Sequence, residues 1–567
     1  MKINRILSIS AACLIFSACN LLDVTPQVIC SETFYNTRDE AIGALVGVYG
    51  SINNEAFYGN FYSLAISNAD DLCYYNRPVP NYNTSVDRHD ASTSEIYMAW
   101  TEIYKGICNA NAFMEAIRNT DFDEDGELYA EARFLRAYYH FVLAQAWGDV
   151  PLRDASVLNY EQSMIAATPQ YEVLSWSASE MEASLANLSE SLENAPSRVN
   201  VYTAHAILSR LYLFMAGESV QGGNKSEFYK KAMDHAETVI LSKKFLLNPD
   251  YSQVFINMIT DCYDRVYYES MWEADFMGLH SADAWSNGRI GDLIGLQSNG
   301  ASNYDSFICN FAHGQYNGSL KLWDLYWAED RTPEESRLDK VTDKRQEWNM
   351  PPYNYAGCKN AELGLDIPAS TEKSPYIYSK KRSFSTSENG EMIDNMTAVA
   401  IRNCGKWRRE KEYETIYNSK QNYTGINFPI MRYSDVLLMY AEASLEYTGE
   451  VSQAAYDAVV LVRDRAEVAT MAKSSYTPDS FRQLIRNERG RELAFEAIRK
   501  YDLIRWGIFE ESMKGYVVDA TDDRWSGSGI SSYASKIGSA VQPKHVLLPI
   551  PAVELGVNSL LKQNSLW

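Results

Sequence analysis

Hydrophobic residues recur three and four positions apart along most of the chain, which is the period of an α-helix with one buried face. Ala41, Leu45 and Val48 follow this period behind Thr37-x-x-Glu40, a capping box in which two side chains satisfy free backbone N–H groups at a helix start. The same spacing predicts further helices over residues 96–117, 128–146, 171–190, 203–216, 227–242, 432–447, 452–467 and 480–506. The pattern therefore predicts an all-α fold.

The predicted helices form successive pairs with Ala and aromatic residues at their contacts, as in tetratricopeptide-like repeats, although the exact repeat signature is absent. The pairs fall in two parts of the chain, residues 19–249 and 426–567. Between them, residues 250–425 are rich in Tyr, Trp, Asn, Ser and Gly, and the helical period fades. We interpret this stretch as an irregular, loop-rich subdomain inserted between the helical parts, and long loops of this kind usually carry function.

Residues 1–18 have the layout of a lipoprotein signal peptide. Lys2 and Arg5 form a basic start, and the apolar run over 6–16 is too short to span a bilayer. Small residues before Cys19 resemble a bacterial lipobox, which implies cleavage before Cys19 and lipidation of that residue. The alternative is ordinary signal-peptidase cleavage beside an incidental cysteine. Since no stretch reaches about 18 consecutive apolar residues, we expect an anchored protein that does not span the membrane.

Composition and net charge limit the functions that the chain can have. The 567 residues are 46% hydrophobic, so the chain can bury a substantial core. Its 74 acidic residues outnumber its 52 basic ones, and a net charge of −22 disfavours binding to nucleic acid. The 39 Tyr, 12 Trp and 20 Phe exceed what a core requires. Some of these amphipathic rings are therefore expected to form a contact surface.

Four segments follow Cys19 in a characteristic order. They are 131–141 with 147–152, then 432–443, then 488–507, and finally 548–551 with Glu554, Asn558, Gln563 and Asn564. Together they resemble one family, the SusD-like (RagB/SusD) nutrient-binding outer-membrane lipoproteins. The resemblance covers essentially the whole mature chain. Ala497 departs from the family pattern, which usually has Gly there, and Val460 and the final residues 564–567 also differ.

This resemblance implies a cell-surface protein, held in the outer membrane by lipid on Cys19. It also implies a SusC-like TonB-dependent transporter as partner, over which the lipoprotein sits as a lid. The ligand is an oligosaccharide in most relatives and a peptide in others, so the chain could be a peptide-binding member of the family. A surface glycoside hydrolase and a peptide-binding repeat protein without a transporter are two further hypotheses. We expect no enzyme activity and no cofactor.

A glycan site needs aromatic faces for the apolar side of the sugar and fixed polar groups for its hydroxyls. Two stretches combine both residue types, 70–83 after the first helix and 285–305 in the irregular subdomain. In SusD-like proteins the ligand also lies between these two regions. The predicted ligand-binding residues are Tyr74, Tyr75, Asn76, Tyr82, Trp285, Asn287, Arg289 and Tyr304.

Two acidic groups could carry chemistry. Glu488, Glu492 and Glu496 recur one helical turn apart, and a close carboxylate pair is the arrangement of a retaining glycosidase. Basic and acidic neighbours favour an ion-pair network instead, because Arg keeps carboxylates ionised and unable to donate a proton. These neighbours are Arg489, Arg491, Arg499, Asp502 and Arg505. The sequence therefore assigns no catalytic residue.

The second acidic group is a weak calcium candidate. Asp121, Asp123 and Asp125 precede Gly126 with the spacing of the first half of an EF-hand loop, but Ala132 stands where the loop needs a bidentate Glu. The same residues can instead form a solvated acidic turn that caps the next helix.

Overall fold

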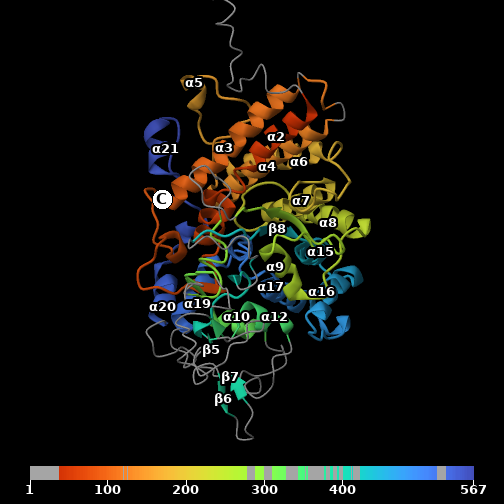
Figure 1. Cartoon of the computed structure of the whole chain (residues 1–567), viewed down its shortest axis with the longest axis vertical. Helices are drawn as coiled ribbons and strands as arrows, with labels where there is room; N and C mark the ends of the chain where they lie inside the picture. Colours follow the sequence, from red (N-terminus) through yellow and green to blue (C-terminus); the bar gives the residue numbers. More distant parts are fainter. Residues whose placement is uncertain are drawn as a thin grey trace, which may run out of the picture.

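The computed structural model describes most of the helical chain and parts of the middle region. The described residues are 37–118, 120–123, 126–277, 288–298, 310–326, 343–351, 353–354, 376–377, 384–386, 392–394, 400–409, 412, 422–519 and 531–567. The molecule is mostly helical, which confirms the predicted fold class (Figure 1). Among the residues that the structure describes, none of the helices is both long and apolar enough to cross a bilayer.

The helices predicted over 96–117, 128–146, 203–216, 227–242, 432–447 and 452–467 lie close to observed helices, and further helices occur that the apolar pattern did not predict. Their bounds are α2 Arg38–Tyr49, α3 Ser94–Ile117, α4 Glu127–Trp147, α5 Tyr160–Ser163, α6 Gln170–Ser184, α7 Val201–Ala216, α8 Lys225–Ser242, α9 Tyr251–Ile259, α10 Leu320–Leu325, α12 Lys344–Asn349, α15 Tyr433–Thr448, α16 Gln453–Arg465, α17 Pro478–Leu493, α18 Arg499–Arg505, α19 Phe509–Asp519, α20 Ser531–Ala540 and α21 Ala552–Val557. Two π-helical turns, η2 Glu55–Gly59 and η3 Phe61–Ile66, and three 3₁₀ turns, η4 Thr84–Val86, η9 Lys473–Ser475 and η10 Pro543–Val546, connect them.

The short strands form antiparallel pairs. They are β1 Cys73–Tyr75 with β3 Tyr316–Gly318, β2 Ser270–Ala274 with β8 Phe428–Arg432, β4 Tyr353–Asn354 with β5 Tyr376–Ile377, and β6 Phe384–Thr386 with β7 Met392–Asp394. In the first pair Cys73 lies opposite Gly318 and Tyr75 opposite Tyr316. This pair ties the loop after the first helices to the middle of the chain.

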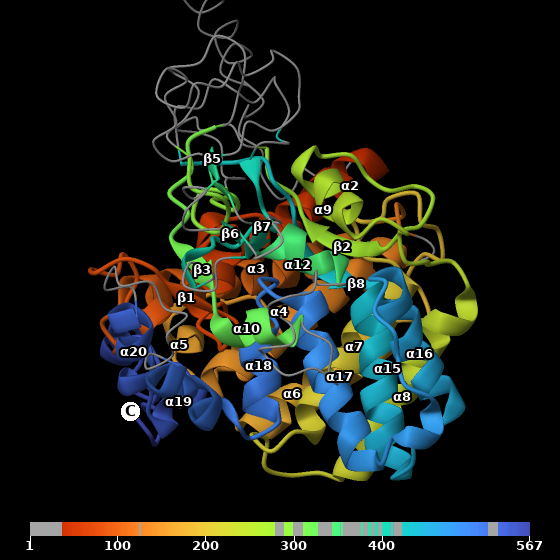
Figure 2. The same ribbon diagram turned by 90° about the horizontal axis from the view of Figure 1, so that it is seen from below.

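The two helical parts of the sequence build one scaffold. Helix α8 packs against α7 from its own part and against α15 from the C-terminal part, and Figure 2 shows these helices side by side with α16 and α17. One hydrophobic cluster runs through the molecule, from Ala41 and Trp147 to Trp272 and Leu437. The middle region is thus packed on a body that neither end of the chain forms alone.

Local sequence explains where several helices begin. The Thr37 side chain accepts a hydrogen bond from the backbone N–H of Glu40, as the capping box predicts. Asn200 accepts from the N–H groups of Tyr202 and Thr203 and so starts α7. Asn and Thr favour these positions because their side chains replace the missing intrahelical acceptor of the first turn.

The prediction of one helix over 480–506 is wrong. Helix α17 ends at Leu493, and α18 begins at Arg499. Between them the backbone takes left-handed conformations at Phe495 (φ 67°) and Ala497 (φ 60°). The apolar spacing continues across the break, so the hydrophobic pattern alone could not show it.

Replacing Ala497 with Gly is expected to raise the free energy of unfolding by about 0.5–1 kcal/mol. A left-handed residue with a Cβ costs roughly 1–2 kcal/mol, and part of the gain is offset by the greater freedom of Gly in the unfolded chain. Urea titration measures the change. The matched control is the exposed helical residue Ala454 in α16, where Gly is expected to destabilise instead. A lower urea midpoint for Ala497→Gly would contradict the strain at this turn.

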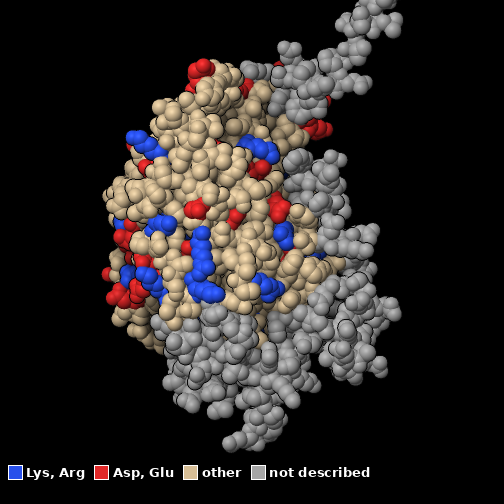
Figure 3. Space-filling model, turned by 90° about the vertical axis from the view of Figure 1, so that its left-hand side faces the viewer, with Lys and Arg blue, Asp and Glu red and all other residues tan. Residues whose placement is uncertain are grey.

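Charged residues occur both at the surface and in the core. Figure 3 shows a face on which basic and acidic side chains lie among one another and among uncharged residues. Lys514 and Glu510, one turn apart on α19, form such an exposed pair. Pairs of this kind contribute little to stability because water and salt screen them. The buried pairs described below matter more.

Candidate functional site

The prediction that Tyr74 and Tyr75 contact a ligand is wrong, because each residue is only 1% exposed. The Tyr74 hydroxyl donates to the backbone carbonyl of Ala400 at 2.5 Å. The Tyr75 ring packs edge-on against Tyr316, with centroids 5.6 Å apart. Both residues lie on β1, and pairing with β3 places them in the core.

Asn76 is also buried, and its amide supports the neighbouring chain. Its Nδ2 donates to the carbonyl of Gly314 at 2.9 Å and to Oδ1 of Asn317 at 2.7 Å. The Tyr75 hydroxyl accepts a hydrogen bond from the backbone N–H of Asn81 at 3.0 Å. Tyr75 and Asn76 therefore hold the loop that carries residue 82, and they do not offer a surface to a ligand.

Tyr82 and Arg289 come together at the surface, although 207 residues separate them. Arg289 Nη1 donates to the Tyr82 hydroxyl at 3.2 Å, and Asn60 Nδ2 donates to the same oxygen at 2.9 Å. The Phe61 ring meets the Tyr82 ring edge-on, with centroids 5.7 Å apart. We name Asn60, Phe61, Tyr82, Arg289 and Asp292 the Tyr82 cluster.

Asp292 fixes the position of the Arg289 guanidinium. The fully buried carboxylate accepts from Arg289 Nε at 3.1 Å and from Nη2 at 2.6 Å. Its other oxygen accepts from Nδ1 of the half-exposed His313 at 2.8 Å. Burial opposes the charge on Arg289, but Asp292 outweighs burial and raises the pKa of Arg289. The arginine is therefore charged and rigid, as a positioned donor must be.

The Tyr82 hydroxyl is a second positioned donor. Burial raises the pKa of Tyr82, although Arg289 and Asn60 act in the opposite direction. The phenol is therefore protonated, and its oxygen already accepts two hydrogen bonds. Among the described residues no acceptor is recorded for its own hydrogen, which is free to meet a ligand hydroxyl. The half-buried rings of Tyr82 and Phe61 supply the apolar face beside it.

The structure brings together two of the predicted ligand residues, Tyr82 and Arg289. Trp285, Asn287 and Tyr304 lie outside the described residues. Sequence reasoning missed Asn60 and Phe61 on the π-helical turns, and Tyr423, whose hydroxyl donates to Glu55 at 3.2 Å. The run 58–62, Tyr-Gly-Asn-Phe-Tyr, combines aromatic and amide residues in the same way and could have indicated them.

The three regularly spaced glutamates form a buried ion-pair network and not a catalytic pair. The pairs are Glu488 with Arg345, Arg463 and Arg491; Glu492 with Arg345, Arg432 and Arg465; and Glu496 with Lys406 and Arg432. Burial opposes ionisation of Glu488, but its arginines, Arg345 first, lower its pKa to about 2. A carboxyl with such a pKa cannot act as a general acid near neutral pH.

The partners within this network differ in part from the predicted ones. Arg491 binds Glu488 directly, as expected. Arg489 instead binds Asp435 and Asp502, Arg499 binds Asp71, and Arg505 binds Glu442 and Asp502. Because α17 ends at Leu493 and α18 begins at Arg499, Arg499 and Arg505 meet different neighbours than a continuous helix would give.

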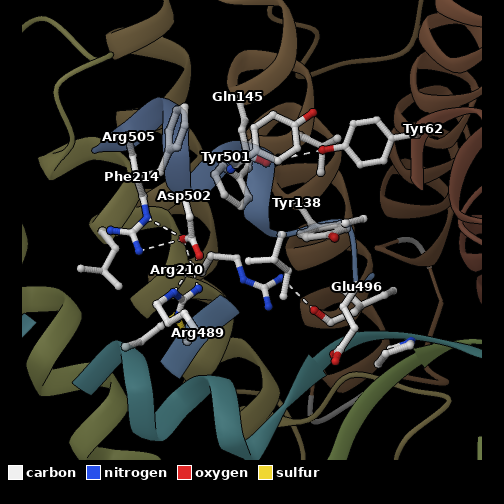
Figure 4. A pocket seen from close by; sticks show the side chains of 18 of the residues that line it. Tyr62, Tyr138, Gln145, Arg210, Phe214, Arg489, Glu496, Tyr501, Asp502 and Arg505 are labelled. Atoms are coloured by element: carbon white, nitrogen blue, oxygen red, sulfur yellow. Dashed lines mark hydrogen bonds and ion pairs between the residues drawn. The ribbon is translucent and has the colours of Figure 1, made fainter. Parts of the chain in front are cut away.

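A small cavity of about 40 Å³ lies in the scaffold, with Arg210, Arg489, Asp502 and Arg505 around it (Figure 4). Asp502 lies between Arg489 and Arg505, at 2.8 Å from each. Pockets that hold ligands of ordinary size measure roughly 300–1,000 Å³. This cavity has room for water and not for a sugar ring.

The calcium candidate lies at the start of α4. Oδ1 of Asp123 accepts from the N–H of Leu128 at 2.9 Å, and Oδ2 accepts from that of Tyr129 at 2.8 Å. Asp123 therefore caps α4, as expected of an acidic turn before a helix. Asp125 is not among the described residues, and within those residues no group of three potential metal ligands occurs. Calcium binding at Asp121, Asp123 and Asp125 stays a prediction.

Comparison with known proteins identifies the fold and the family. Residues 268–567, more than half of the chain, match the model of the SusD family. The chain belongs to the SusD family. Residues 39–213 match a second, related model, described as starch-binding associating with outer membrane. The family predicted from the four sequence segments is thereby confirmed.

Individual SusD-like proteins are similar over nearly their whole length. SusD-like protein P25 of Formosa agariphila is 24% identical, over 97% of this chain and 95% of its own. The crystal structure of a SusD homolog from Bacteroides thetaiotaomicron superposes with a TM-score of 0.78 at 24% identity, covering 95% of this chain and 98% of the homolog. A SusD-like carbohydrate binding protein from Bacteroides fragilis gives 0.67 at 21% identity, covering 94% and 100%.

Proposed function

We propose that this SusD-family protein is a lipid-anchored cell-surface protein that captures oligosaccharides and delivers them to a SusC-like TonB-dependent transporter. The observation that carries the proposal is the hydrogen bond between Arg289 and Tyr82, which builds an aromatic and polar corner from two distant segments. Similarity to a carbohydrate-binding structure and to the starch-binding family model supports a glycan as ligand.

The Tyr82 cluster has the chemistry of a binding site. Tyr82 and Phe61 offer ring faces and edges to the apolar side of a sugar, while the Arg289 and Tyr82 N–H and O–H groups are fixed in direction. The carboxylate of the cluster, Asp292, is fully buried and engaged by Arg289 and His313. It is therefore occupied with positioning and has no access to a glycosidic bond, so we propose binding without hydrolysis.

A screen of the purified mature protein against polysaccharides and peptides tests this proposal. We expect calorimetric binding of one glycan class, no release of reducing ends during long incubation, and no binding of peptides. Selective peptide binding would favour a peptide-binding member of the family. Release of reducing ends by the purified protein would favour a hydrolase.

The proposed anchor makes a separate prediction. Cys19→Ala is expected to move the protein from the membrane fraction to the soluble fraction without changing its thermal unfolding, because acyl chains contribute about 0.8 kcal/mol per buried CH₂. Fractionation should use cells that lack the transporter, which could otherwise retain the protein. Unchanged membrane retention in such cells would rule out lipid on Cys19 as the anchor.

The transporter is the proposed protein partner. We expect a TonB-dependent outer-membrane transporter to copurify with the lipidated protein and to be encoded beside it. Purification without any such transporter would favour a binding protein that acts alone.

A further inference from the structure

A solvent-open groove that shares no residue with the Tyr82 cluster has a volume of about 620 Å³. It lies between α10, α17 and α19, which Figure 2 shows on the side of the molecule seen from below. Its size falls in the range of roughly 300–1,000 Å³ typical of small-molecule sites. Lys321 and Asp324 come from α10, Gln483 and Arg486 from α17, and Ser512 and Gly515 from α19.

At the floor of the groove, the charge of the Asp71 carboxylate is neutralised by Arg499 and Lys321. Asp71 is almost fully buried there and accepts from Arg499 Nε at 2.8 Å, from Ser512 Oγ at 2.8 Å and from Lys321. Burial acts to raise the pKa of Asp71, but Arg499 and Lys321 outweigh it and lower the pKa well below its usual range. The floor therefore carries a satisfied carboxylate and does not require a bound cation.

Arg486, on the wall, differs from the arginines around it. Among the described residues its guanidinium forms no ion pair, and its buried Nε has no hydrogen-bond partner. The nearby carboxylates are already engaged, since Glu446 binds Arg482 and Glu442 binds Arg505. Burial, aided by Arg505 and Arg482, lowers the pKa of Arg486. The site therefore contains a partly desolvated cation that lacks an anion.

The Arg486 side chain has the chemistry to hold a bidentate anion. Its guanidinium lies over the Trp506 ring, 4.8 Å from the centroid. Stacking on a ring leaves the N–H donors at the edge of the guanidinium, where a carboxylate can accept two parallel hydrogen bonds. Asp324 and Glu511 are exposed at the rim and would repel a polyanion. The groove thus favours a ligand with one carboxylate on an otherwise uncharged body.

We propose that this groove binds a carboxylate-bearing ligand, whose carboxylate pairs with the Arg486 guanidinium. The uronic acid residue of a glycan supplies this group, a choice that rests on the proposed glycan-binding function. The free C-terminus of a peptide is the alternative that the test distinguishes. Hydroxyl or amide groups of the same ligand can meet Gln483 and Ser512. The site is independent of the Tyr82 cluster, because the two share no residue.

The test measures binding of D-glucuronate by calorimetry, with its neutral methyl ester as the matched probe. A second arm uses acetyl-Gly-Gly with a free or an amidated C-terminus. We expect D-glucuronate to bind about tenfold or more tightly than its methyl ester. A preference for the free carboxylate in the peptide pair alone would overturn the assignment to a glycan. Equal or absent binding of both members in both pairs would overturn the carboxylate site itself.

Two variants locate the binding. Arg486→Gln is expected to abolish the preference for the free carboxylate. Gly515→Phe is expected to block the groove, because Gly515 lines it and a Cβ added there meets nothing within 4 Å. Gly556→Phe in α21 is the control, since Gly556 has the same open surroundings. Carboxylate preference retained in both Arg486→Gln and Gly515→Phe, with folding intact, would overturn the assignment to this groove.

Binding of a neutral oligosaccharide serves as an internal reference. Both groove variants are expected to bind it like the parent, because the Tyr82 cluster is unchanged. If they lose neutral-glycan binding as well, the groove and the cluster act as one site, and the proposal of a separate carboxylate site is wrong.

Discussion

Glu492→Gln is expected to lower the free energy of unfolding by about 3–5 kcal/mol, because it removes the charge that balances several buried cations. The Glu492 carboxylate accepts from Arg465 at 2.6 Å, from Arg432 at 2.9 Å and from Arg345 at 3.1 Å. In the variant these guanidiniums keep their charge in a dry environment with too few anions. Denaturant titration measures the loss, and ligand affinity of the folded fraction is expected to stay near that of the parent.

The control for this variant is Glu172→Gln. Glu172 is exposed in the first turn of α6, so its replacement is expected to change stability by less than about 0.5 kcal/mol. A loss of turnover on a glycan in Glu492→Gln, with stability intact, would show that the network has a catalytic role and would contradict our interpretation.

The same network makes the free energy of unfolding depend on pH. The pKa of Glu488 falls from its ordinary 4.5 to about 2, because Arg345 and its other arginines outweigh burial. The unfolded chain therefore binds a proton at higher pH than the folded protein does. The stabilisation is complete above about pH 4.5 and is lost as pH falls towards 2. Thermal unfolding across this window should show a smaller acid-induced fall for Glu488→Gln, which starts from lower stability.

The second large expected effect is a loss of affinity for the ligand. Tyr82→Ala and Arg289→Gln are each expected to weaken binding of the glycan found in the screen by about 1–3 kcal/mol. Tyr82→Phe keeps the ring and removes only the hydroxyl, so the difference between Tyr82→Ala and Tyr82→Phe separates ring contact from hydrogen bonding. Calorimetry measures the affinities, and circular dichroism checks folding. If Tyr82→Ala and Arg289→Gln both bind like the parent, the site lies elsewhere.

Tyr75→Ala is a contrasting control. Tyr75 is buried against Tyr316, so its truncation is expected to cost about 3–5 kcal/mol of stability, and any loss of binding should follow unfolding. Trp285, which lies outside the described residues, remains a predicted ligand contact. Trp285→Ala is expected to weaken glycan binding with folding unchanged.

The sequence alone predicted the scaffold because helices depend on nearby residues. The apolar spacing that predicts 203–216 matches α7, and Asn200 caps that helix with an interaction only two and three residues away. The ion-pair character of Glu488, Glu492 and Glu496 was also predictable, because basic neighbours accompany them. The family likewise rests on four contiguous segments that can be compared without a structure.

Only the tertiary structure decided which of the predicted side chains are buried, because burial depends on which distant segments meet. Tyr74 and Tyr75 resemble exposed ligand contacts in the sequence, but pairing of β1 with β3 buries them. Tyr82, seven residues after Tyr75, stays half-buried at the surface because residues 60 and 289 reach it from other elements. The helix break at Ala497 and the unpaired Arg486 guanidinium also depend on contacts between distant segments. Local pattern determined which residues form helices, and long-range contacts determined which side chains remain available to a ligand.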